Sequence, residues 1–206
     1  PATPNVLYTL PQEKVFNGTS DFVDTGVQLF KTDQDFTITM HVTADNDQVQ
    51  DTACILHCMK EQSPFPGITF HKSGASKFGL APGSNTSAMT DLIDYGQRTK
   101  VVIVKNGTTI KVYTSNGTNK ESAYNFTSIE QTLLLGAYQP ISGNKGRFFK
   151  GTIHEFSIIK GVYTAEQISN YFGKIPDGKR VFKIDSTCMN TESNKLTDSI
   201  GGIEAT

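Results

Sequence analysis

Hydrophobic and polar residues alternate along most of the chain, in short runs that are separated by turn-forming residues. This period of two is typical of β-strands with one buried face. The pattern predicts strands at 15–16, 22–25, 36–42, 53–59, 67–71, 78–81, 99–105, 108–114, 131–137 and 148–159. A series of short strands of this kind predicts an all-β sandwich or barrel, and not alternating strands and helices.

One hairpin is marked especially clearly. Asn106-Gly107 lies between two alternating runs and predicts a hairpin over 101–113, because two-residue turns favour residues that tolerate positive φ. Five asparagines also match the glycosylation sequon: Asn17, Asn85, Asn106, Asn116 and Asn125. We interpret the Asn-Gly pairs as turn chemistry, which hairpin geometry demands in any compartment.

The sequence predicts one short helix, in the C-terminal part of the chain. Thr164 precedes Gln167 by three residues, the spacing of a capping box that satisfies free N–H groups in the first turn. Gly173 suits a left-handed helix end, and Pro176 prevents continuation. The sequence therefore predicts a helix near 164–172, directly after a long strand in which Gly151 marks a bulge or a close approach of backbone.

Composition excludes several classes of partner. Lys and Arg total 19 and Asp and Glu total 20, for a net charge of -1, so charge offers no basis for binding nucleic acid. No apolar run approaches the roughly 20 residues of a membrane helix, and we expect no membrane insertion. A chain of 206 residues can form one core, so we expect a single domain, 1–206. Its first residue is Pro1, which suggests a fragment of a longer protein with further domains.

The cysteines do not form a secretory disulfide framework. Cys54 and Cys58 are expected on one face of a strand with Leu56, about 13 Å apart and too far to pair. His57 would point to the opposite face. We therefore favour small core residues over a zinc site.

Two polar, turn-rich stretches carry candidate binding residues. The first opens at Tyr138, whose ring could stack on a sugar, and continues with polar groups able to meet sugar hydroxyls: Gln139, Asn144 and Arg147. The second, at 83–98, is interpreted as a long loop, and such loops are often functional. Its candidates are Asp91, Asp94, Tyr95 and Arg98. We expect them to form a groove wall with the Tyr138 loop if the sheets bring the two loops together.

Five segments resemble a known family. They are 15–26 (VFNGTSDFVDTG), 36–40 (FTITM), 135–136 (LG), 149–159 (FKGTIHEFSII) and 163–168 (YTAEQI). They are similar to the opening strands and the closing strand and helix of the concanavalin A-like, laminin G-like jelly-roll superfamily. The resemblance implies an all-β, two-sheet antiparallel jelly-roll sandwich with one short helix.

The resemblance also bears on calcium binding and on catalysis. Relatives often bind calcium, which implies calcium as a candidate cofactor. The candidate ligands are Asp21 with Asp24, or the turn Asp45-Asn46-Asp47. Some relatives are glucanases with paired carboxylates on one strand, but residues 152–156 contain only Glu155. His154 stands where Asp is usual in the family, and the chain has no Trp. Catalysis is therefore not expected, and stacking would depend on Tyr or Phe.

These observations favour a lectin-like, noncatalytic carbohydrate-binding module. By resemblance, it would attach a larger protein or a phage particle to cell-surface or cell-wall polysaccharide, in host recognition or adhesion. It would be extracellular, as part of a virion tail or of a secreted or cell-surface protein. The alternative is a protein-binding or structural adhesion module, and a glycoside hydrolase is less favoured.

Overall fold

The computed structural model describes residues 5–83, 88–140 and 143–173, together with the backbone of 189–190, 195–197 and 204–205. Its contacts divide the chain into two compact units, Pro1–Tyr163 and Thr164–Thr206. The prediction of one domain over 1–206 stays a prediction. No helix in the described part of the chain is long and apolar enough to cross a membrane.

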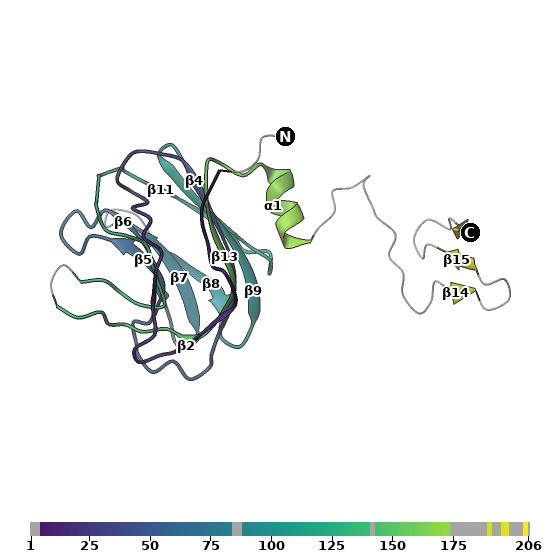
Figure 1. Ribbon diagram of the computed structural model, residues 1–206, viewed down its shortest axis with the longest axis horizontal. Coiled ribbons are helices and arrows are strands. Elements are labelled where there is room, and N and C mark those ends of the chain that lie inside the picture. The colour runs from purple at the N-terminus through teal and green to yellow at the C-terminus, as the bar shows by residue number, and fades with distance from the viewer. Residues whose placement is uncertain are drawn as a thin grey trace. The chain divides into compact units, whose positions relative to one another are not determined.

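The first unit contains two antiparallel sheets (Figure 1). The seven-stranded sheet has the order β1 (Asn5–Thr9), β13 (Lys150–Lys160), β4 (Phe36–Ala44), β9 (Arg98–Asn106), β10 (Thr109–Thr114) and β11 (Asn119–Ala123), and β2 (Lys14–Asn17) also pairs with β13. The six-stranded sheet has the order β3 (Val23–Asp24), β12 (Leu134–Leu135), β5 (Cys54–Met59), β6 (Gly67–Lys72), β7 (Lys77–Pro82) and β8 (Met89–Asp94). The predicted all-β, two-sheet antiparallel jelly-roll sandwich is confirmed.

The core forms where the alternating strands turn their apolar faces toward one another. Along β4, Phe36, Ile38, Met40 and Val42 are all fully buried, whereas the intervening residues are mostly threonines. Aromatic rings fill the centre, and the ring centroids of Phe78 and Phe149 lie 5.7 Å apart at 82°. The period-two pattern of the sequence is thus the direct cause of this layer.

The second unit begins with the predicted helix, α1 (Ala165–Phe172). Thr164 Oγ1 accepts a hydrogen bond from the Gln167 backbone N–H at 3.2 Å, and the Thr164 N–H donates to Gln167 Oε1 at 2.8 Å. Gly173 ends the helix with φ 78°, so the capping box and the helix end are confirmed. Pro176 lies outside the described residues. A further antiparallel sheet contains β14 (Met189–Asn190), β15 (Lys195–Thr197) and β16 (Glu204–Ala205).

The interpretation of 83–98 as a loop is wrong, because Met89–Asp94 forms β8. A bulge in the pairing of β7 with β8 interrupts the ladder, and Asp91 has a left-handed φ of 59°. As a result Leu92 and Ile93 are both buried, and the alternation that marks a strand is lost. Strands β1 and β11 are likewise absent from the prediction.

A second bulge corrects the placement of the cysteines. The pairing of β5 with β6 shifts register between Cys54 and Leu56, and the extra residue turns Cys54 away from the core. Its Sγ lies 3.7 Å from Thr69 Oγ1, and Thr69 pairs with His57. Cys54 therefore shares the outer face with His57. Of these two cysteines, Cys58 is the one that lies in the core.

The predicted hairpin over 101–113 is confirmed, with a turn one residue later than expected. Asn106 is the last residue of β9 and pairs with Thr109, so the turn residues are Gly107 and Thr108. Gly107 has φ 54°, which glycine adopts without strain. Gly151 is confirmed as a point of close approach, because a Cβ there would overlap the Thr43 carbonyl.

Candidate functional site

The first candidate site lies on the outer face of the six-stranded sheet, where the chain leaves β12. Backbone hydrogen bonds close this loop, from Tyr138 N to Gly146 O at 2.8 Å and from Gly146 N to Tyr138 O at 3.3 Å. Tyr138 and Arg147 thereby come side by side at the base of the loop. We call Tyr138, Arg147, Glu61 and His57 the Tyr138 cluster.

Arg147 is held in an unusual backbone conformation. Its φ is 52°, in the left-handed region that a non-glycine residue rarely occupies. The Cys54 N–H donates to the Arg147 carbonyl at 2.7 Å, which fixes this conformation. Strain of this kind persists only where the surroundings enforce it, and it concentrates at functional sites.

The guanidinium of Arg147 lies over the Tyr138 ring, with Cζ 4.2 Å from the ring centroid. Its Nη1 also pairs with Glu61 Oε1 at 3.2 Å. Beneath this layer, the His57 ring packs against Tyr138 with centroids 4.7 Å apart at 69°. Burial, with the Glu61 carboxylate nearby, raises the pKa of Tyr138 to about 12. The phenol is neutral at physiological pH, and the ring serves first as a support for Arg147.

The rest of the loop presents polar and aromatic groups. Asn144 is exposed, and the Gln139 amide donates to the Pro140 carbonyl at 3.3 Å. Lys145 Nζ lies 4.4 Å from the centroid of Phe22, whose side chain is 41% exposed. Phe22 and Lys145 were absent from the predicted site. Their contact joins segments more than a hundred residues apart, and no local pattern marks it.

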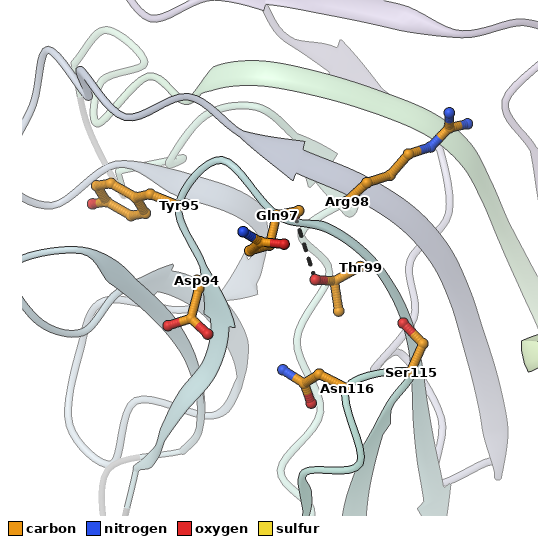
Figure 2. A pocket seen from close by; sticks show the side chains of 7 residues that line it. All are labelled: Asp94, Tyr95, Gln97, Arg98, Thr99, Ser115 and Asn116. Carbon is orange, nitrogen blue, oxygen red and sulfur yellow. Dashed lines mark hydrogen bonds between the residues drawn. The ribbon is translucent and has the colours of Figure 1, made fainter.

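The second group of predicted residues lies around a separate hollow of about 450 Å³ (Figure 2). Its lining residues are Asp94, Tyr95, Gln97, Arg98, Thr99, Ser115 and Asn116. Asp91 is not among them. Figure 2 shows that the Arg98 side chain runs away from Ser115 and Asn116, and its Nε donates to His41 Nε2 at 3.1 Å. The hollow thus includes three of the four predicted residues.

The two groups do not form one groove. Tyr138 follows β12 and Asp94 ends β8, and strands β5, β6 and β7 lie between β12 and β8 in the sheet. Four interstrand steps correspond to about 19 Å. No residue between 138 and 147 that the structure describes lines the hollow. The conditional expectation of a shared wall is therefore not met.

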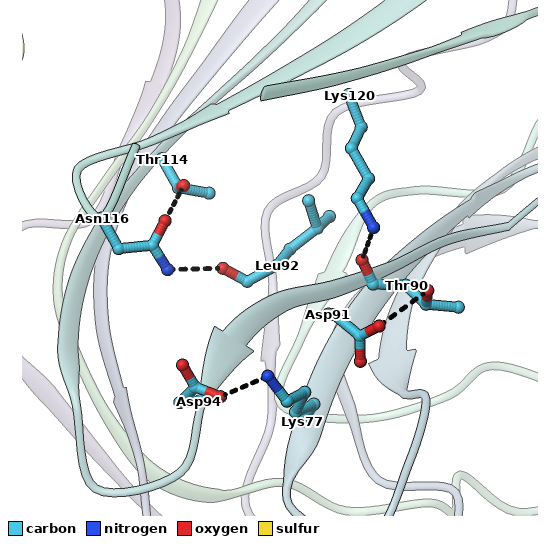
Figure 3. A network of polar contacts seen from close by, with 8 residues as sticks. All are labelled: Lys77, Thr90, Asp91, Leu92, Asp94, Thr114, Asn116 and Lys120. Carbon is cyan, nitrogen blue, oxygen red and sulfur yellow. Dashed lines mark hydrogen bonds and ion pairs between the residues drawn. The ribbon is translucent and has the colours of Figure 1, made fainter. Parts of the chain in front are cut away.

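A polar network fixes the strand beside the hollow (Figure 3). Asp94 Oδ1 pairs with Lys77 Nζ at 2.9 Å, and Thr90 Oγ1 donates to Asp91 Oδ2 at 3.2 Å. Side chains from the neighbouring hairpin also reach carbonyls of β8, since Asn116 Nδ2 donates to Leu92 O at 3.3 Å. Asp91 and Asp94 therefore act in local contacts at the edge of the sheet, which these contacts protect.

The residues expected to bind calcium make local contacts. Asp21 Oδ2 accepts from the Asn17 N–H at 3.1 Å, and Asp24 Oδ1 accepts from the Gly26 N–H at 2.9 Å. Calcium needs six to eight oxygen ligands. Within 5–83, 88–140 and 143–173, no group of three or more His, Cys, Asp or Glu residues could hold a metal ion. The assignment of calcium to Asp21 and Asp24 stays a prediction.

The fold defines a class, the antiparallel jelly-roll sandwich. The family model described as the concanavalin A-like lectin/glucanases superfamily matches residues 17–169. The chain belongs to this superfamily, which confirms the resemblance seen in the sequence. No curated protein sequence matches the chain.

Solved structures share the fold at low sequence identity. The CBM40 module of the Ruminococcus gnavus IT-sialidase, bound to α2,3 sialyllactose, has a TM-score of 0.60 at 10% identity, over 81% of this chain and 100% of that one. Domain 4 of the Geobacillus stearothermophilus arabinanase AbnA, in complex with arabinotriose, has a TM-score of 0.54 at 21% identity, over 76% and 74%. The Streptococcus pneumoniae NanB sialidase has a TM-score of 0.59 at 13% identity, over 80% of this chain, which spans only 28% of NanB.

Proposed function

We propose that this protein is a noncatalytic carbohydrate-binding module. It attaches a larger protein or a phage particle to cell-surface or cell-wall polysaccharide, outside the cell, as part of a virion tail or of a secreted or cell-surface protein. Membership of the superfamily supports the carbohydrate class. Two structures that share the fold were solved with sialyllactose and arabinotriose, which also supports a glycan ligand.

The observation that carries the proposal is the arrangement of the Tyr138 cluster. The Arg147 side chain is 40% exposed, yet its position is fixed from three sides by Tyr138, Glu61 and the strained backbone. A preorganised planar donor group at the surface suits hydroxyl and carboxylate groups of a sugar, because little side-chain entropy is lost on binding. Gln139 and Asn144 supply further hydrogen-bonding groups on the same loop.

Two observations support a noncatalytic role. The match with this chain extends over the full length of the isolated CBM40 module, but over only 28% of the NanB sialidase. On β13, the acidic residue Glu155 lies beside His154, whose side chain contacts Glu13 and Thr43. These are the contacts of a surface polar network, and they differ from the paired carboxylates of glycoside hydrolysis.

We predict that Arg147→Ala weakens glycan binding by about tenfold or more, since it removes the exposed charged group. Tyr138→Ala is expected to weaken binding as well, because it removes the support that fixes Arg147. Binding is measured with the purified chain on a panel of glycans and bacterial cell-wall polysaccharides, with calcium and with chelator. Product analysis on the same samples tests for hydrolysis.

Lys111→Ala is the matched control, because it removes an exposed cation that, like Arg147, is paired with a carboxylate, Glu121, at 2.8 Å, and that lies on β10 of the other sheet. Saturable binding without product, weakened by both cluster variants and kept in the control, supports the proposal. Unchanged binding in both variants would reject this loop as the site. Loss of binding in chelator would assign a metal to the module.

A further inference from the structure

The hollow of Figure 2 lies at the seam where the two sheets meet. β8 belongs to the six-stranded sheet. β9 and β10, which carry the other lining residues at their ends, belong to the seven-stranded sheet. The walls are held firmly: the Gly96 N–H donates to Ala44 O at 2.7 Å, and Asn116 Oδ1 accepts from the Thr118 N–H at 3.0 Å. Its volume of about 450 Å³ lies within the range of small-molecule sites.

Two side chains that line this hollow keep hydrogen-bonding capacity that their contacts with other described residues do not use. No hydrogen bond of the described residues uses the side-chain amide of Gln97, which offers a donor and an acceptor. Ser115 Oγ accepts from the Lys100 N–H at 3.0 Å, so its own hydroxyl proton is available. Figure 2 shows both side chains beside the same space, Gln97 from the turn before β9 and Ser115 from the turn after β10.

The two charged side chains that line the hollow already make contacts within the protein. The Asp94 carboxylate is paired with Lys77 at 2.9 Å (Figure 3), and the guanidinium of Arg98 is directed to His41. The remaining lining groups are amides, hydroxyls and the phenol of Tyr95. A neutral ligand with several hydroxyl groups matches this lining, because the groups left to meet it are mostly uncharged donors and acceptors and the Arg98 guanidinium is directed to His41.

We propose that this hollow is a second binding site, which takes a neutral mono- or disaccharide unit through Gln97 and Ser115. The inference extends the proposed carbohydrate-binding function and adds a site independent of the Tyr138 cluster. Because three strands separate the two sites, one module would hold two points of a polysaccharide. Two weak contacts on one module increase overall attachment by raising the effective concentration at the second site.

The test is a titration of the ¹⁵N-labelled chain followed by NMR. The probes are arabinotriose, methyl α-glucopyranoside and methyl α-galactopyranoside, each added separately. We expect saturating shifts of the backbone amides of Gln97 and Ser115 with at least one probe. The Gln97→Ala/Ser115→Ala variant should lose these shifts, with the affinity at the hollow reduced at least tenfold. Arg147→Ala should keep them.

Gln12→Ala is the matched control, because Gln12 is an exposed glutamine outside both sites. Shifts that survive in the double variant, or that vanish equally in the control, would overturn the second site. So would an absence of saturating shifts at Gln97 and Ser115 while the amides around Arg147 respond to sugar. That last result would be compatible with the proposed function. An absence of sugar-induced shifts both at the hollow and around Arg147 would contradict the second site and the proposed function alike.

Discussion

Replacing Gly136 with alanine is expected to lower the free energy of unfolding by about 2–5 kcal/mol. Two costs add: a left-handed backbone disfavours any Cβ by about 1–2 kcal/mol, and overpacking of a core costs about 1–3 kcal/mol. Gly136 has φ 78°, and a Cβ there would overlap the ring of Phe16. That ring is only 1% exposed and packs on Phe149 at 5.9 Å, so it cannot swing aside.

Gly26→Ala separates the two costs. Gly26 has a similar φ of 69°, but a Cβ at this position would meet nothing within 4 Å. Chemical denaturation of both variants measures the difference. A loss for Gly136→Ala that only equals the loss for Gly26→Ala would show that the core adjusts around the added methyl group, contrary to this prediction.

Local patterns in the sequence predict local structure well. The helix follows from Thr164, Gln167 and Gly173 alone, because a cap is made by residues three positions apart. The strand at β4 follows from strict alternation, because one face is buried in the core. The resemblance to the superfamily then supplies the two-sheet arrangement, which alternation alone leaves open between sandwich and barrel.

The misses share a physical cause, which is the influence of neighbouring strands. At β8, a bulge breaks the alternation of buried and exposed residues. The polar residues that face outward at this sheet edge then have the composition of a loop. At Cys54, one extra residue exchanges the faces of the strand, and no feature of 53–59 alone specifies that exchange. Register is set by pairing with the partner strand, so a single-strand pattern cannot locate such bulges.

The candidate site was predictable only along the loop. Tyr138, Gln139, Asn144 and Arg147 are close in sequence, and their turn-rich context marks them. Glu61 is 86 positions from Arg147, and its role depends entirely on how the sheet folds. The same holds for His57, which the pattern places on the outer face but cannot place beneath Tyr138.

The burial of His57 makes the protein sensitive to acid. The side chain is 1% exposed, its Nε2 donates to Met59 O at 3.0 Å, and its Nδ1 has no hydrogen-bond partner. A second proton would therefore create a cation that is buried away from water. Desolvation is the main cause that lowers the pKa of His57 to about 4, and the Arg147 charge acts in the same direction, whereas Glu61 opposes it.

The sign of the pH effect follows from this lowered pKa. Below about pH 6.5 the unfolded chain binds a proton at His57 that the folded chain does not, so stability falls as the pH falls. The loss at this residue is about 2 kcal/mol by pH 5 and about 3 kcal/mol by pH 4, at 1.36 kcal/mol per pKa unit. His71 adds to the loss, because desolvation also lowers its pKa.

Denaturation of wild type and His57→Gln at pH 7.5 and pH 5 measures the contribution of His57. Glutamine keeps an N–H donor for the Met59 carbonyl and cannot titrate, so the variant should lose about 2 kcal/mol less than wild type between the two pH values. Comparing each protein with itself at pH 7.5 removes any packing cost of the substitution. Equal losses in the two proteins would mean that His57 becomes protonated within the fold, and that the layer of Tyr138 and Arg147 above it admits water.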